Sequence, residues 1–121
     1  PVTGGERGVP ERILLWLTPH PSTAMLIRRG RRVADYLGSP CTAVYAEKDA
    51  AALGQYLNFC RNLRIDAKPI ACTEQARGVA EYAREKGITQ VYVTRNAPDV
   101  TKLVNLARDM QVTIVAERVR P

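Results

Sequence analysis

The stretch WLTPHPSTAMLIRRGRR, residues 16–32, concentrates the side chains most suited to binding chemistry. It contains the only Trp and the only His of the chain, with prolines on both sides of His20, and four arginines. An apolar run precedes it and a helical pattern starts at Ser22, whose side chain is a good N-cap. The free N–H groups of a helix start hold anions. Thr18, Ser22 and Thr23 add hydroxyl groups, so the stretch indicates an anion or nucleotide site.

Catalysis is not indicated by any motif in the chain. There is no Gly-x-Gly-x-x-Gly run, no phosphate-binding P-loop and no Gly-x-Ser-x-Gly elbow. Acid–base work needs a partner, and no nucleophile stands beside His20. The three cysteines lack CxxC spacing and lie in apolar patterns, so we interpret them as buried hydrophobes in a reducing compartment. A metal site is not expected either.

The net positive charge favours an anionic partner but does not identify its chemical class. The formal net charge is +6 and the pI is about 9.6. The run from Arg28 to Arg32 is interpreted first as a solvated helix face. Nucleic acid ranks last among the partners, because no named motif and no interleaved surface aromatics accompany these arginines. Arg95, in the loop TRNAPD (94–99), could face a phosphate on the far side of a cleft.

Nine segments alternate between strand and helix patterns. Continuous apolar runs predict buried strands, and apolar residues at helical spacing predict helices. Such alternation requires parallel strands and right-handed crossovers. The fold class is therefore an α/β protein, a three-layer α/β/α sandwich around a five-stranded parallel sheet. The expected strands are 12–18, 41–46, 66–72, 89–94 and 112–119, and the expected helices are 22–38, 50–63, 74–87 and 98–110.

Local signals refine these elements. Pro69 predicts an edge strand, since proline cannot donate to a ladder. Pro98 is expected at or near the first helical position, with Asp99 in the first turn. The last strand could pair with a second copy of the chain, although Glu117 and Arg118 could instead protect that edge.

The domain organisation is expected to be simple. Residues 1–10 are interpreted as a flexible arm, linker or cloning remnant, and residues 11–121 as one domain. The first residues lack the apolar core of a signal peptide, and no apolar run is long enough to span a bilayer. Ligands of such sheets bind beyond the carboxyl ends of the strands, where the strand order reverses. Residues 17–22 fall at that edge.

The segment ARGVAEYAREKGITQVYVTRN (76–96), with the order of elements, resembles the universal stress protein family. The chain is most similar to the stress-protein domain of KdpD-type potassium-sensing histidine kinases, from about residue 11 to 119. The resemblance implies a Rossmann-like fold that binds adenine nucleotides, and it implies two ligand patterns. The ATP pattern has an Asp after strand 1, where Thr18 stands here, and glycines after strand 4, where TRNAPDVTKLVNLARD has none.

The second pattern belongs to cyclic di-AMP binding. It pairs Ser-x-Ser with Phe-Thr-Ala-x-Tyr twenty residues later. Thr18 and His20 align with its first part, and CTAVY (41–45) with its second, so that Thr42, Ala43 and Tyr45 match. The alternative is that this segment is only a β-strand, with Ala43 and Tyr45 sharing a face beneath a helix.

The resulting hypothesis is a non-catalytic sensory or regulatory domain of a KdpD-like two-component signalling protein. The parent would be a sensor histidine kinase, and the domain would be cytoplasmic or on the cytoplasmic side of an inner-membrane protein. No cofactor is certain; the ligand would be cyclic di-AMP or ATP. The alternatives are a free-standing ATP-binding universal stress protein and a pure protein-interaction module. The expected partners are an adenine nucleotide, other domains of the parent and a second copy bound through the last strand.

Overall fold

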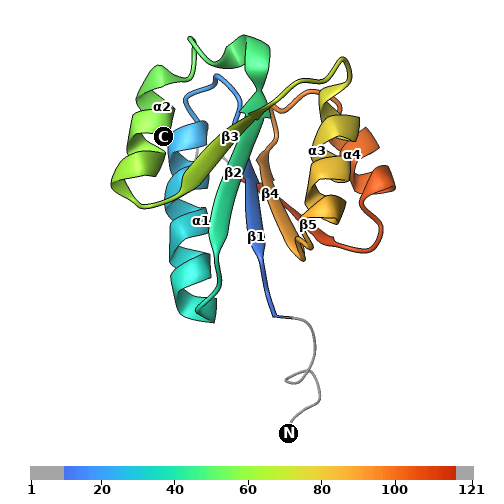
Figure 1. Ribbon diagram of the computed structural model, residues 1–121, viewed down its shortest axis with the longest axis horizontal. Helices are drawn as coiled ribbons and strands as arrows, with labels where there is room; N and C mark the ends of the chain where they lie inside the picture. Colours follow the sequence, from blue (N-terminus) through green and yellow to red (C-terminus); the bar gives the residue numbers. More distant parts are fainter. Residues whose placement is uncertain (1–9, 117–121) are drawn as a thin grey trace, which may run out of the picture.

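The computed structural model describes residues 10–116 of the 121-residue chain as an α/β fold. Five parallel strands alternate with four α-helices, as the sequence predicts (Figure 1). The strands are β1 (Ile13–Trp16), β2 (Cys41–Ala46), β3 (Asp66–Ile70), β4 (Gln90–Thr94) and β5 (Gln111–Val115). The helices are α1 (Thr23–Leu37), the short 3-10 helix η2 (Glu47–Asp49), α2 (Gly54–Asn62), α3 (Gln75–Glu85) and α4 (Val100–Leu106).

The sheet has the order β3-β2-β1-β4-β5. The chain therefore passes from β1 through β2 to β3 at one edge, and then crosses back to place β4 on the other side of β1. β3 is an edge strand that pairs only with β2, and Pro69 lies opposite Tyr45 in that pairing. The edge position predicted from Pro69 is confirmed, since a proline without an N–H is tolerated there.

The two faces of the sheet carry separate helix layers. α1 and α2 cover one face and α3 and α4 cover the other (Figure 1). The N-terminal end of β1 lies at the opposite end of the sheet from the loops that follow β1 and β4. Successive residues of β1 alternate between the layers: Leu15 packs under α1 and α2, and Trp16 packs under α3. Both side chains are fully buried, as expected for a central parallel strand.

Two helices differ from the prediction. α2 begins at Gly54 instead of near Ala50, because residues 47–49 form η2 and a turn follows it. α4 begins at Val100, and Pro98 lies outside it. Asp99 is the N-cap in the left-handed region, with φ 58°, so it is not a first-turn residue. The turn that carries buried Ala97, whose N–H donates to the Thr94 carbonyl, delays the helix start.

Other signals are confirmed. Gly38 ends α1 in the left-handed conformation, and its N–H donates to the Asp35 carbonyl. No helix within residues 10–116 has the length and apolar character needed to cross a membrane. Residues 1–9 and residues 117–119 of the predicted last strand, with Glu117 and Arg118, lie outside the described residues.

Candidate functional site

The switch point lies between β1 and β4, where the strand order reverses. In open parallel sheets the crevice beyond the carboxyl ends of these two strands is the usual ligand position. The β1–α1 loop and the β4–α4 loop meet at this position, where Asn96 contacts His20. Residues 17–22, the part of the stretch 16–32 that was expected at the ligand edge, therefore do lie beyond the carboxyl end of β1.

The β1–α1 loop is folded around the carbonyl group of Thr18. That oxygen accepts a hydrogen bond from the backbone N–H of His20, at 2.8 Å, and another from the hydroxyl of Thr23. Thr23 is fully buried. The loop is thus a compact turn with its own hydrogen bonds.

The helix cap differs from the prediction. Ser22 has helical backbone angles, φ −66° and ψ −12°, and its side chain makes no capping hydrogen bond. Instead its backbone N–H donates to Nδ1 of His20 at 3.1 Å, and its hydroxyl lies 2.8 Å from the same nitrogen. The imidazole therefore accepts the N–H of Ser22, while the N–H groups of Thr23 and Ala24 donate to backbone carbonyls. Because a backbone N–H can only donate, Nδ1 is the acceptor in its contact with Ser22.

A side-chain contact joins the two loops. The amide nitrogen of Asn96, on the β4–α4 loop, lies 3.3 Å from Nδ1 of His20. Sequence reasoning missed Asn96 and selected its neighbour Arg95, which is exposed. The sequence signal for Asn96 was its position alone, in the loop after β4, which lies across the switch point from β1.

Three buried polar atoms at this edge have no hydrogen-bond partner among residues 10–116: Trp16 Nε1, Thr18 Oγ1 and Thr94 Oγ1. Trp16 ends β1 and Thr94 ends β4. An unsatisfied buried polar group costs about 1–3 kcal/mol, so native proteins keep few of them. The sequence patterns predict Thr18 as a ligand-binding residue but predict no such role for Trp16 or Thr94.

The second half of the cyclic di-AMP pattern lies away from this turn. Thr42 is near the amino end of β2, opposite Leu14. Ala43 and Tyr45 are buried in the core with residues of α1 and α2. The alternative that these two side chains pack beneath a helix is thus confirmed. Thr18, His20 and Ser22 come together with Asn96; Thr42 and Ala43 do not join them.

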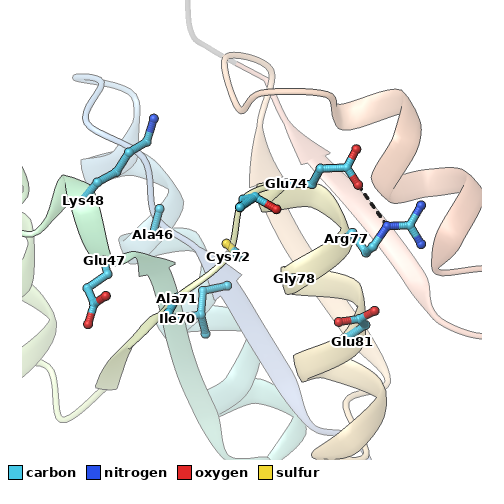
Figure 2. Close-up of a pocket in the computed structure, with 11 residues that line it drawn as sticks. Ala46, Glu47, Lys48, Ile70, Ala71, Cys72, Glu74, Arg77, Gly78 and Glu81 are labelled. Atoms are coloured by element: carbon cyan, nitrogen blue, oxygen red, sulfur yellow. Dashed lines mark hydrogen bonds and ion pairs between the residues drawn. The ribbon is translucent and has the colours of Figure 1, made fainter.

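A separate cavity of about 650 Å³ opens at the carboxyl ends of β2 and β3, beside the start of α3. Figure 2 shows Cys72 between Lys48 on one side and Arg77 on the other. Hydrogen bonds from Lys102 and Arg77 lower the pKa of Glu74 at its rim. None of the seven residues predicted for the site lines it. Its lining consists of residues 46–48, 70–74, 77, 78 and 81.

Metal binding finds no support among the described residues, where no group of three potential His, Cys, Asp or Glu ligands occurs. Burial raises the pKa of the Cys41 thiol to about 11 and that of Cys60 to about 12. Both thiols are therefore protonated and poorly nucleophilic at neutral pH.

No protein-family model and no curated protein matches the chain. Solved structures do. A universal stress protein crystallised in complex with cAMP is 12% identical, over 88% of this chain and 96% of that one, with a TM-score of 0.71. A universal stress protein from Archaeoglobus fulgidus is 11% identical over 92% and 97% of the two chains, also with a TM-score of 0.71. The Archaeoglobus protein in complex with dAMP is 14% identical over 88% and 98%, with a TM-score of 0.68. At these identities the comparison establishes the fold, which is the universal stress protein fold.

Proposed function

We propose that this chain is a non-catalytic regulatory domain of the universal stress protein class, which binds an adenine nucleotide at the carboxyl edge of its sheet. The observation that carries the proposal is a pair of buried hydroxyls at the switch point, Thr18 Oγ1 just beyond β1 and Thr94 Oγ1 at the end of β4, which have no hydrogen-bond partner among residues 10–116. A ribose or phosphate oxygen would satisfy them. Similar proteins crystallised with cAMP and dAMP support an adenine nucleotide as the ligand.

The residues present fit a nucleotide with one phosphate better than ATP. A triphosphate needs several backbone N–H groups in a glycine-rich nest, and residues 94–106 contain no glycine. α4 has only seven residues, and Asp99 places a negative charge before it. Arg95 would supply one cation to a single phosphate.

Access to the two hydroxyls requires movement of the loops. Thr18 and Thr94 are 4% and 1% exposed, beneath the turns that carry His20 and Asn96. The ligand would replace the contact between His20 and Asn96 and form hydrogen bonds with both side chains. The base would extend toward Ala46, which belongs to the strand next to β1 and lines the cavity of about 650 Å³. This volume suits a small-molecule ligand.

A finer proposal concerns the parent protein and its signal. The resemblance to KdpD-type kinases supports a cytoplasmic sensory domain of a potassium-responsive two-component kinase, with cyclic di-AMP as the ligand. In that case Tyr45, which is 8% exposed and packs beneath α1 and α2, does not offer the base a stacking surface. Thr42 and Ala43 would not contact the ligand and would affect its binding only through the position of β2.

Calorimetric titration with AMP, cAMP, cyclic di-AMP and ATP tests both levels of the proposal. We expect AMP or a cyclic adenine nucleotide to bind more tightly than ATP. Thr18→Val and Thr94→Val each remove one hydrogen bond, worth about 1 kcal/mol or roughly a fivefold loss of affinity. Thr101→Val, on the exposed surface of α4, is the matched control.

The outcomes separate the alternatives. Tight ATP binding would favour the free-standing ATP-binding stress protein. Cyclic di-AMP binding that depends on Thr18 and His20 would support the KdpD-like parent. Absence of binding by all four nucleotides would overturn the nucleotide proposal and leave a protein-interaction module.

We further propose that two copies pair through β5. β5 is the second edge of the described sheet, and Ile114 on it is 45% exposed, with Val104 of α4 44% exposed. Light scattering over a concentration series should give a dimer that Ile114→Lys converts to a monomer. A monomer at all concentrations contradicts this pairing.

A further inference from the structure

The layer of α1 and α2 carries most of the net positive charge of the chain. Residues 23–37 and 54–64 include six arginines and only one acidic residue, Asp35, whereas the whole chain has a net charge of +6. The two helices lie side by side on one face of the sheet (Figure 1). One helix layer is thus strongly basic, and it is not the layer that contains the cavity beside α3.

Only part of this charge has a structural role. Arg31 is half-buried, pairs with Asp35 at 3.0 Å and donates to the Leu63 carbonyl at 3.1 Å, so it ties α1 to the end of α2. Arg28 lies over the ring of Phe59, 5.4 Å from its centroid. The other arginines of these two segments are exposed and have no ion-pair partner among residues 10–116, although Arg61 donates to Asn58 Oδ1; they are Arg29, Arg32, Arg61 and Arg64.

A shallow apolar cleft of about 190 Å³ lies between the two helices beside Arg28. Ala24 and Arg28 line it from α1, and Gln55, Tyr56 and Phe59 line it from α2. The volume suits the side chain of one apolar residue. Arginine and tyrosine are enriched at protein interfaces, where a central apolar anchor with a polar rim is the usual arrangement.

Nucleic acid and membrane fit this surface less well. Base stacking needs a free aromatic face, but Tyr56 and Phe59 are half-buried against the core and Arg28 covers the Phe59 ring. A lipid surface would contact the arginines yet leave the cleft between the helices unfilled. A polypeptide can fill the cleft and pair with the arginines at the same time.

We propose that the α1–α2 face binds an acidic segment of a partner protein, which inserts one apolar side chain between Ala24, Tyr56 and Phe59. Carboxylates on either side of that residue pair with Arg28 and Arg32, whose planar guanidinium groups donate two parallel hydrogen bonds to a carboxylate. The segment is acidic because the face has almost no negative charge of its own. This interaction is independent of the nucleotide proposal, since it uses neither loop at the switch point.

Selection of phage-displayed random 12-residue peptides on the intact chain tests this proposal. We expect a consensus of acidic residues around one apolar residue, with synthetic peptides measured by fluorescence polarisation. Arg28→Glu/Arg32→Glu should weaken binding at least tenfold, and Ala24→Leu, which fills the cleft without a charge change, at least fivefold. Lys86→Glu/Arg108→Glu, outside this face and with the same change in net charge, should leave affinity within twofold.

Several results would overturn the inference. They are the absence of any enriched consensus, a consensus without acidic residues, and equal losses in the two double variants. Tighter binding of phosphatidylserine vesicles or of a 20-nucleotide oligo-dT, lost in Arg28→Glu/Arg32→Glu, would assign the face to lipid or nucleic acid instead. Circular dichroism of each variant checks that the fold is retained.

Discussion

The hydroxyl of Thr94 is almost completely buried and has no hydrogen-bond partner among the described residues. Valine has the same shape without the unsatisfied oxygen. We therefore predict that Thr94→Val raises the free energy of unfolding of the ligand-free protein by about 1 kcal/mol, while it weakens nucleotide binding. Urea unfolding of the variant with and without AMP measures both effects.

The opposite signs make this prediction specific. A residue kept only for packing would show no loss of affinity in Thr94→Val. A residue with a hidden structural hydrogen bond would lose stability in the same variant. Either result contradicts the interpretation of Thr94 as a ligand group, and Thr101→Val again serves as the control.

The cysteines provide a second prediction for individual residues. Burial raises the pKa of Cys41 to about 11 and of Cys60 to about 12, whereas Cys72 is only partly buried and lines the cavity beside α3. At pH 8 a disulfide reagent such as DTNB should react readily with Cys72 alone. All three thiols should react in denaturant.

The pH dependence of that reaction has a definite sign. Desolvation also raises the pKa of Cys72, so its thiolate fraction and reaction rate increase as the pH rises toward that pKa. Cys72→Ser should remove the fast reaction. Rapid labelling of a second thiol in the native protein would show that the α1–α2 side of the core opens readily.

The residues of the site were only partly predictable from the sequence. Thr18 and His20 were found because they follow the first apolar run, at the edge where ligands bind. The side-chain cap predicted for Ser22 is absent, since N-cap statistics favour serine and carry no information on a nearby imidazole. Asn96 lies 76 positions from His20, and such an apposition is set by strand order and not by local sequence.

Among the elements, the contact between α1 and β1 depends on a glycine. A Cβ at Gly30 would lie 2.4 Å from Cδ2 and 2.9 Å from Cδ1 of the fully buried Leu15. We predict that Gly30→Ala destabilises the protein by about 1–3 kcal/mol through overpacking, despite a gain of about 1 kcal/mol in helix propensity. Chemical denaturation measures the change.

Gly54 is the matched control for that substitution. It is the first residue of α2, and a Cβ there meets no atom within 4 Å. Gly54→Ala should therefore be neutral or stabilising by up to about 1 kcal/mol. Equal effects of the two substitutions would contradict the close packing of α1 on β1.

The strands were predicted more accurately than the helices, for a physical reason. Continuous apolar runs mark the buried strands, and β2 coincides with its predicted range of 41–46. The start of α2 was wrong because apolar residues at helical spacing continue through the turn before Gly54. The start of α4 was wrong because a proline is favoured at the first helical position, whereas Pro98 lies in the turn before the N-cap Asp99.

At the scale of the whole molecule, the alternation of elements predicted the parallel sheet and the position of the ligand edge. Which cavity forms beside that edge could not be predicted, because it depends on how α3 packs against the turn after β3. Gly78 permits this contact: a Cβ there would lie 2.8 Å from Cβ of Cys72. The sequence contains Gly78 but does not indicate that Cys72 packs against it.

The two core clusters share one sheet, and this predicts a single unfolding transition. Trp16 lies in the cluster beneath α3 and α4, whereas Leu53 lies in the cluster beneath α1 and α2. Leu53 is fully buried, so Leu53→Ala should cost about 2–5 kcal/mol. If the domain unfolds as one unit, the urea midpoint reported by Trp16 fluorescence must fall as far as the midpoint from circular dichroism.

Leu103→Ala, in the same cluster as Trp16, is the control that should shift both signals as well. A Trp16 transition that does not move in Leu53→Ala would mean that the two layers unfold separately. The distinction bears on function, because a ligand at the switch point contacts the loops after β1 and β4, whereas the proposed partner binds α1 and α2. Only a cooperative sheet lets binding at one of these sites stabilise the whole molecule, including the other.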